Sequence, residues 1–100
     1  MERRQPNVAV LGAGSWGTAV ASILAASAPT ILWARSPQVA EEIDTDNRNS
    51  AYLGDVALND RLRATADLER AVANADVLVM GVPSHGFREA LEHAAPFVRP

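Results

Sequence analysis

The chain has 100 residues, 48% of them hydrophobic, and a formal net charge of −3 at pH 7. This length allows one small domain with a buried core, and without an excess of basic residues we expect no nucleic-acid partner. No apolar run reaches the roughly 20 residues of a membrane span, and the absence of cysteine excludes disulfides, thiol catalysis and thiolate metal sites and favours a cytoplasmic location.

The first expected element is a strand over residues 7–11, which is apolar throughout like a parallel strand covered on both faces. It leads directly into Gly12-x-Gly14-x-x-Gly17 and a run with helical periodicity. Alone this glycine pattern is a weak signal, but between a strand and a helix it predicts a turn that binds a dinucleotide. Gly12 would allow the tight turn, Gly14 the approach of a pyrophosphate, and Gly17 close packing of the helix on the sheet. The backbone N–H groups of residues 15–17 would then face the phosphates at the positive end of the helix dipole.

Two other interpretations of this stretch are open. The glycines can form a turn that binds nothing. The segment can also be a secretory signal, because Arg3 and Arg4 precede an apolar stretch and residues 25–28 look like a small-residue cleavage site. A signal fits poorly, since the glycines, Ser15 and Thr18 interrupt the apolar segment and the strand–helix alternation continues after it.

The helix after Ser15 is expected to pack on the sheet through one stripe, formed by Trp16, Val20, Ile23, Leu24 and Ser27. Pro29 ends it, and residues 30–34 predict a second strand, rich in β-branched and aromatic side chains. Ser36 as N-cap and Pro37 at the first helical position open a second helix. Its inward residues are expected to be Val39, Ala40 and Ile43.

The pattern is least regular over residues 47–62, and residues 62–65 predict a short third strand. A short helix follows from Asp67, and residues 76–82 predict a fourth strand. Pro83 ends that strand because proline cannot donate to a ladder. Ser84 then caps a last helix, whose buried side would hold Phe87, Ala90, Leu91 and Ala94.

This order of elements predicts an α/β fold with a Rossmann-type, doubly wound parallel sheet, strand order 3-2-1-4, and right-handed crossovers. A complete fold of this type has about six strands, and only four are expected here. The sheet is therefore incomplete, and we expect residues 1–100 to be the N-terminal part of a dinucleotide-binding domain. Met1 would be the native start of a longer protein, whose substrate domain is absent from this chain.

In a parallel sheet all strands end on the same edge, so Gly12, Arg35, Val82 and Pro83 are expected to come together where ligands bind. Arg35 closes the second strand, where NAD-binding proteins usually carry an acidic residue for the ribose 2′-hydroxyl. A guanidinium there can bind a 2′-phosphate, which favours NADPH over NADH. The alternative is a solvated surface arginine.

Other side chains near this edge have two interpretations each. Trp16 is either core or a lid beside the pyrophosphate, whereas Trp33, in mid-strand, is expected in the core. Tyr52 can reach the adenosine end of a cofactor or anchor its loop. Ser84 has a sufficient role as an N-cap, and His85 has no partner carboxylate in view, so we expect a helix-start or cofactor contact instead of catalysis.

Four motifs together resemble one family. The chain reads G-A-G-S-W-G-T-A over residues 12–19, L-W-A-R over 32–35, N-x-x-Y-L-G over 49–54 and V-P-S-H-x-F-R over 82–88. These look like the N-terminal half-domain of bacterial NAD(P)-dependent glycerol-3-phosphate dehydrogenase. The resemblance covers residues 7–97, and the joint occurrence of the motifs is specific although each is short.

The resemblance implies an oxidoreductase that interconverts sn-glycerol 3-phosphate and dihydroxyacetone phosphate by hydride transfer, in cytoplasmic glycerophospholipid synthesis, as a homodimer when full length. By matching position, the turn over residues 12–17 would hold the pyrophosphate and the turn over 82–85 would lie near the nicotinamide. The contacts with NADPH, for which NADH is a possible substitute, would come from Ser15, Trp16, Arg35 and Tyr52. The family's substrate lysines have no counterpart, because the chain contains no lysine. We therefore expect no catalytic residue in this chain, and cofactor binding without turnover. We also expect no metal site.

Two alternatives keep the fold but change the function. One is a related dehydrogenase that acts on another substrate, such as 6-phosphogluconate or a hydroxyacyl compound. The other is a regulatory module that senses NAD(P) without catalysis. A lysine at the end of the next strand, just beyond Pro100, would favour the enzyme.

Overall fold

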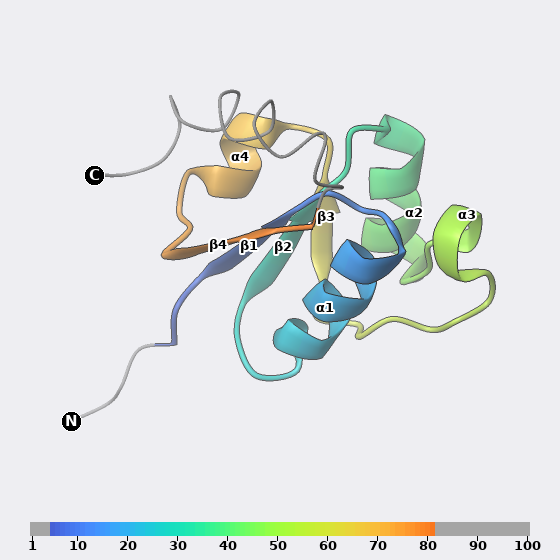
Figure 1. Ribbon diagram of the computed structural model, residues 1–100, viewed down its shortest axis with the longest axis horizontal. Helices are drawn as coiled ribbons and strands as arrows, with labels where there is room; N and C mark the ends of the chain where they lie inside the picture. The colour runs from blue at the N-terminus through green and yellow to red at the C-terminus, as the bar shows by residue number, and fades with distance from the viewer. Residues whose placement is uncertain (1–4, 82–100) are drawn as a thin grey trace.

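The structure, a computed structural model, describes residues 5–81, which form four short strands and four helices (Figure 1). In chain order they are β1 (Val8–Leu11), α1 (Ser15–Ala25), β2 (Thr30–Trp33), α2 (Pro37–Asp46), α3 (Ser50–Leu53), β3 (Arg63–Thr65), α4 (Leu68–Val72) and β4 (Val77–Met80). The expected last helix, with Val82, Pro83, Ser84 and His85, lies outside the described residues. None of the described helices is long and apolar enough to cross a membrane.

The strands form one sheet in the order β3-β2-β1-β4, and all neighbouring pairs are parallel. This confirms the predicted doubly wound arrangement. Val8 of β1 is aligned with Thr30 of β2 on one side and with Val77 of β4 on the other. Because the strands start in register, they also end together, at a single carboxyl edge of the sheet.

Helices cover both faces of this sheet, as Figure 1 shows. Val8 and Val10 of β1 point to the face covered by α1 and α2, where they join a buried cluster with Ala21, Ala25, Leu32, Ala40, Ile43, Leu58, Leu62 and Ala64. The alternate residues Ala9 and Leu11 point to the other face, where α4 contributes Ala71 and Val72. The apolar run of β1 thus reflects burial on both sides.

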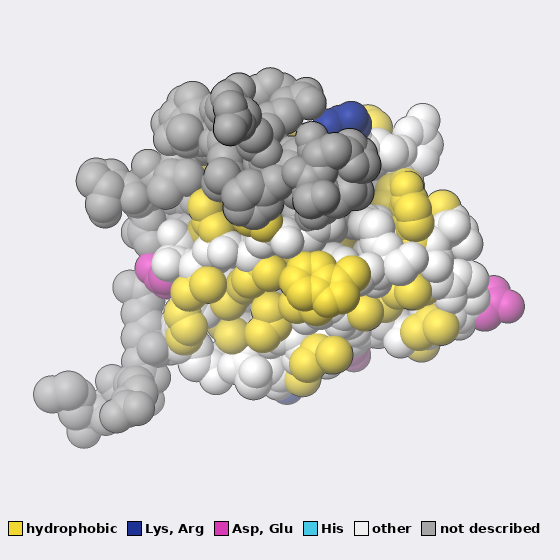
Figure 2. Space-filling view, viewed as in Figure 1, with side chains coloured by type: hydrophobic (Ala, Val, Ile, Leu, Met, Phe, Trp, Pro, Cys, Tyr) yellow, Lys and Arg dark blue, Asp and Glu magenta, His cyan; other side chains and the backbone are white. Residues whose placement is uncertain are grey.

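The predicted packing face of α1 is wrong for three of its five residues, because Trp16, Ile23 and Ser27 are exposed. Trp16 is 60% exposed and Ile23 is 72% exposed, while the buried residues of the helix are the small ones: Gly17, Thr18, Ala21 and Ala25. Small side chains let the helix lie close against the sheet, so Trp16 and Ile23 are turned outward, whereas Leu24 still packs against the buried cluster. Figure 2 shows hydrophobic side chains spread over the face on which α1 lies in Figure 1.

The start of α2 follows the prediction, with Ser36 as N-cap and Pro37 at the first position. The Ser36 hydroxyl accepts a hydrogen bond from the Val39 N–H at 3.4 Å, and Ala40 and Ile43 are buried. The helix ends at Asn47, which adopts the left-handed conformation with φ of 57°. Asparagine tolerates this conformation better than most residues.

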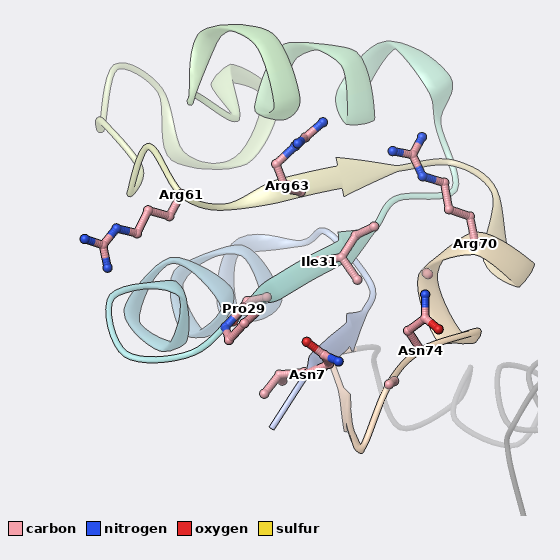
Figure 3. Close-up of a pocket in the computed structure, with 11 residues that line it drawn as sticks. Asn7, Pro29, Ile31, Arg61, Arg63, Arg70 and Asn74 are labelled. Carbon is pink, nitrogen blue, oxygen red and sulfur yellow. The ribbon is translucent and has the colours of Figure 1, made fainter. Parts of the chain in front are cut away.

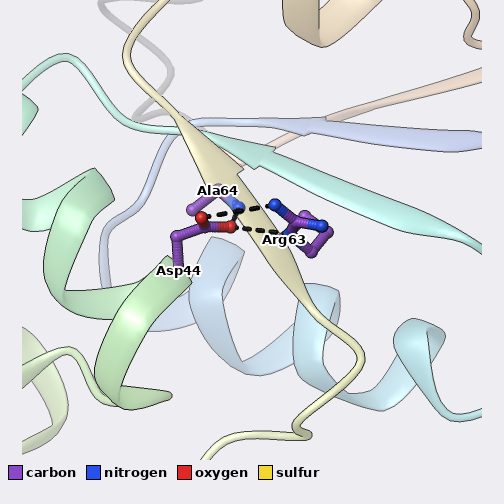
Figure 4. A network of polar contacts seen from close by, with 3 residues as sticks. All are labelled: Asp44, Arg63 and Ala64. Carbon is purple, nitrogen blue, oxygen red and sulfur yellow. Dashed lines mark hydrogen bonds and ion pairs between the residues drawn. The ribbon is translucent and has the colours of Figure 1, made fainter.

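Near its end, α2 is joined to the edge strand β3 by Asp44 (Figure 4). Its Oδ1 accepts hydrogen bonds from Arg63 Nε and from the Ala64 N–H, both at 2.9 Å. The bond from Arg63 is the main reason that the pKa of Asp44 lies below its ordinary value of 3.8, and the Ala64 N–H acts in the same direction. Asp44 thus satisfies a backbone donor on the outer side of β3, where no strand of residues 5–81 pairs.

The irregular segment over residues 47–62 packs on the same core as α1 and α2. It contains the single-turn helix α3, and its residues Leu58 and Leu62 are buried. The Asn59 N–H donates to Ser22 Oγ of α1 at 2.8 Å. The predicted third strand and the helix after Asp67 are confirmed as β3 and α4, and Asp67 caps α4 by accepting from the Arg70 N–H at 3.3 Å.

Candidate functional site

The turn between β1 and α1 leaves the amino end of α1 without a cap. Gly14 is the N-cap residue, so no side chain fills that role, and the first turn of the helix holds no acidic residue. Within residues 5–81, no atom accepts a hydrogen bond from the backbone N–H groups of Ser15, Trp16 and Gly17. Unpaired N–H groups at the positive end of an 11-residue helix are suited to bind an anion such as a phosphate.

Gly12 and Gly17 allow the turn to pack tightly. Gly12 has φ of 117°, a conformation that side chains rarely adopt. A Cβ atom on Gly17 would overlap the Gly12 carbonyl oxygen and would come within 3.3 Å of the Gly81 carbonyl oxygen. The start of α1 therefore rests directly on the backbone at the carboxyl ends of β1 and β4.

Gly14 differs from these two glycines because the protein itself does not require it. Its φ of −78° is ordinary, and a Cβ atom added there would meet nothing within 4 Å. The space beside Gly14 lies next to the uncapped end of α1. A ligand that approaches the backbone closely, as a diphosphate does, would fill this space, so the residues present fit a dinucleotide.

Arg35 lies at the same edge of the sheet as the glycine turn. The Gly12 N–H donates to the Trp33 carbonyl at 3.0 Å, and the Ala34 N–H donates to the Thr65 carbonyl at 3.0 Å. These bonds hold the chain just before Arg35 to the neighbouring strand ends. The Arg35 side chain is exposed and makes no hydrogen bond or ion pair with another residue of the described part, so its charge is available to a ligand.

The structure separates the alternatives for three aromatic residues. The exposure of Trp16 excludes the core interpretation. Trp33 is half-buried against the cluster around Ala9 and Leu11, with its Nε1 donating to the Ala66 carbonyl at 3.0 Å, as expected of a core residue. The Tyr52 side chain is 56% exposed, so its ring is not the anchor of its loop.

The backbone of Tyr52 contacts the predicted site. Ser15 Oγ, at the first position of α1, donates to the Tyr52 carbonyl oxygen at 3.3 Å. This bond brings α3 to the glycine turn across 37 positions of sequence. Two residues predicted to bind the cofactor, Ser15 and Tyr52, are thus neighbours in the fold.

Asn49 is a residue of this site that the sequence did not reveal. It is fully buried, and its Nδ2 donates to the Ala13 carbonyl oxygen and to Thr18 Oγ1, both at 2.9 Å. In the sequence it was only the first letter of the N-x-x-Y-L-G motif. An asparagine before a short helix predicts a cap, and Asn49 does occupy the N-cap position of α3. No pattern in the sequence indicates that Asn49 is buried against the glycine turn.

A pocket of about 310 Å³ lies away from the predicted site, at the amino ends of β1 and β2 and beside α4 (Figure 3). Its lining residues include three arginines: Arg61, Arg63 and Arg70. Their guanidinium groups point in different directions in Figure 3, and Arg63 already pairs with Asp44. We therefore do not place the dinucleotide there. Among the described residues, no group of three or more histidine, aspartate or glutamate side chains could hold a metal ion.

Comparison with known proteins agrees with the family that the four sequence motifs resemble. The sequence pattern of the family described as NAD-dependent glycerol-3-phosphate dehydrogenase N-terminus matches residues 7–100. A Mycobacterium avium protein named glycerol-3-phosphate dehydrogenase (NAD(P)+) is 56% identical over 100 residues, which are 99% of this chain and 29% of that protein. A protein of the same name, numbered 2, from Sphingopyxis alaskensis is 50% identical over 93 residues, or 93% of this chain and 28% of that protein.

Solved structures agree with these relatives. The crystal structure of a glycerol-3-phosphate dehydrogenase from Coxiella burnetii superposes with a TM-score of 0.86 at 30% identity, covering 96% of this chain and 30% of that one. The yeast enzyme matches equally well, with a TM-score of 0.86 over 96% of this chain and 31% of its own, but at 24% identity this shows the fold alone. The chain spans less than a third of the length of the proteins it matches.

Proposed function

The chain belongs to the family described as NAD-dependent glycerol-3-phosphate dehydrogenase N-terminus, as its sequence motifs predicted, and we propose that it is the dinucleotide-binding part of a longer oxidoreductase. In that protein, dihydroxyacetone phosphate and sn-glycerol 3-phosphate would be interconverted. The nicotinamide, when bound, would supply or accept the hydride. The residues of this chain would bind and orient the dinucleotide, and the residues that bind and protonate the substrate would lie beyond Pro100.

The observation that carries this proposal is the uncapped amino end of α1 beside the open space at Gly14. The N–H groups of Ser15, Trp16 and Gly17 would donate to the diphosphate oxygens, with the helix dipole adding to the attraction. No carboxylate of the described residues accepts from these N–H groups. An anion would therefore bind there without displacing a protein group.

We assign the remaining contacts by their place at the same edge. Arg35 would bind the 2′-phosphate of NADPH, which makes NADPH the preferred cofactor and NADH the weaker one. The exposed rings of Trp16 and Tyr52 would border the dinucleotide. Val82 and Pro83, which follow Gly81 in the sequence, would lie on the nicotinamide side.

The setting of the longer protein is also part of the proposal. The absence of cysteine supports a cytoplasmic protein, in which glycerophospholipid synthesis would use the product. We propose a homodimer. The exposed Ile23 and Val77 leave apolar surface that a second subunit, or the rest of the same polypeptide, would cover.

An assay of the complete protein tests this function. Dihydroxyacetone phosphate is supplied with NADPH or NADH, and the loss of the reduced nicotinamide is followed by its absorbance, with other keto acids and keto phosphates as controls. We expect turnover of dihydroxyacetone phosphate. Turnover of another keto substrate alone would favour a related dehydrogenase, and tight NADPH binding without turnover of any substrate would favour a sensor.

A further inference from the structure

The side-chain amide of Asn49 joins two segments that form the dinucleotide site. Its Nδ2 donates to the Ala13 carbonyl in the glycine turn and to Thr18 Oγ1 in α1. Its own backbone carbonyl accepts from the N–H groups of Tyr52 and Leu53, at 3.2 and 2.7 Å. One residue thus ties the glycine turn to the short helix that carries Tyr52.

The orientation of this amide is fixed by chemistry. If its oxygen and nitrogen were exchanged, the oxygen would face the Ala13 carbonyl, and two acceptors would oppose each other. With the nitrogen there, Asn49 Oδ1 is buried and has no hydrogen-bond partner among the described residues.

The bond to Ala13 has a consequence for Gly14. The Ala13 carbonyl and the Gly14 N–H belong to one planar trans peptide, in which they point in opposite directions. Because Asn49 holds the carbonyl, the Gly14 N–H must point away from Asn49. No residue within the described range accepts a hydrogen bond from that N–H.

We infer that Asn49 is a positioning residue of the dinucleotide site, which fixes the Ala13–Gly14 peptide so that the Gly14 N–H is aimed at the diphosphate. The inference rests on the proposed function and deepens it. Asn49 is buried and would not touch the cofactor. It would act through the glycine turn, while the Ser15 bond to the Tyr52 carbonyl holds α3 in the same place.

Asn49→Asp in the complete protein provides the test, with NADP⁺ affinity measured by calorimetry. The aspartate has the same shape, but when charged it cannot donate to the Ala13 carbonyl. We expect affinity about tenfold lower than that of the wild type at neutral pH, as for a lost oriented hydrogen bond to an ionised group. Burial raises the pKa of such a carboxyl. As the pH falls, the protonated form regains one donor, so the ratio to the wild-type affinity should recover.

Leu62→Ala is the control for a loss of stability, since Leu62 is buried in the core and its apolar side chain can make no hydrogen bond to the glycine turn. It should lower the free energy of unfolding and leave NADP⁺ affinity unchanged. The inference is overturned if Asn49→Asp binds like the wild type, if its affinity ratio does not change with pH, or if Leu62→Ala loses as much affinity. Wild-type protein that binds no NADP⁺ would instead contradict the proposed function itself.

A second measurement does not depend on the variant folding. In the wild-type protein, the Gly14 amide resonance should shift on NADP⁺ addition together with those of Ser15 and Trp16. Shifts at Ser15 and Trp16 without one at Gly14 would overturn the role of Asn49 and leave the proposed function intact.

Discussion

Gly17 lies so close to Gly12 that a Cβ atom on Gly17 would overlap the Gly12 carbonyl oxygen. The first turn of α1 is therefore in backbone contact with the end of β1. Gly81 adds to this contact, because a Cβ atom there would come within 2.9 Å of the Gly17 Cα. Two of the three glycines in the motif are thus needed by the fold, whereas Gly14 is left for a ligand.

Gly17→Ala should destabilise the protein. The added methyl group has no space and can be accommodated only if α1 moves off the sheet, so we expect the free energy of unfolding to fall by about 1–3 kcal/mol or more. Chemical denaturation followed by circular dichroism measures this. A wild-type unfolding midpoint would contradict the contact between Gly17 and Gly12.

Gly14→Ala should leave the stability of the protein nearly unchanged and weaken cofactor binding. Its methyl group meets no protein atom, so the free energy of unfolding should change by less than about 1 kcal/mol. NADPH affinity should fall about tenfold or more, since the methyl group keeps the diphosphate from the backbone donors. Calorimetric titration of both glycine variants gives the comparison, and unchanged affinity in Gly14→Ala would exclude close approach of a ligand at this position.

Arg35→Glu should narrow or reverse the preference for NADPH over NADH. The substitution replaces the group that binds the 2′-phosphate by one that repels it and that can accept from a ribose hydroxyl. Arg61→Glu is the matched control, because Arg61 is also exposed but lines the pocket at the amino edge of the sheet. Dissociation constants for both nucleotides are measured by fluorescence. Equal effects of the two substitutions would mean that only overall charge matters.

Asp44 should make the stability of the protein depend on pH in the acid range. Its pKa is lower in the folded chain than its ordinary value of 3.8, chiefly because of the bond from Arg63. The carboxylate therefore stabilises the fold above the ordinary pKa, and this contribution is lost as the pH falls through the lowered pKa. The ion pair is partly exposed, because the side chain of Arg63 is 62% exposed and that of Asp44 is 31% exposed. Solvent therefore weakens the attraction between the two charges.

Asp44→Asn tests this directly, because the amide oxygen can still accept from the Ala64 N–H while the charge is lost. We expect a loss of about 0.5–1 kcal/mol in the free energy of unfolding at neutral pH. The difference from the wild type should shrink when urea denaturation is repeated at about pH 3. A difference that stays constant over this range would show that Asp44 acts through packing instead of charge.

Much of the fold could be predicted because strand order and element type follow from local patterns. Apolar runs, Ser36-Pro37 and the helical periodicity after Asp67 each mark an element that the structure contains. The buried face of α1 could not be predicted in this way. Hydrophobic periodicity selects large apolar residues such as Trp16 and Ile23 as the buried face. The close contact of α1 with the sheet requires small residues instead, and hydrophobicity alone does not indicate how close a helix lies to a sheet.

The candidate site, too, was predicted from the sequence only in part. The glycine turn was predicted from its motif between a strand and a helix. Arg35 was predicted because parallel strands end at one edge, which is a property of the topology. Asn49 was missed because its role depends on where the irregular segment over residues 47–62 folds back. No periodicity in that segment predicts a contact with Ala13, 36 positions earlier.

A crystal structure of the complete protein with NADPH bound is the most direct test of where the cofactor lies. We expect the diphosphate within hydrogen-bonding distance of the N–H groups of Ser15, Trp16 and Gly17, and the 2′-phosphate on the Arg35 guanidinium. A nucleotide bound instead at the amino edge of the sheet, between Arg61 and Arg70, would contradict the proposed site.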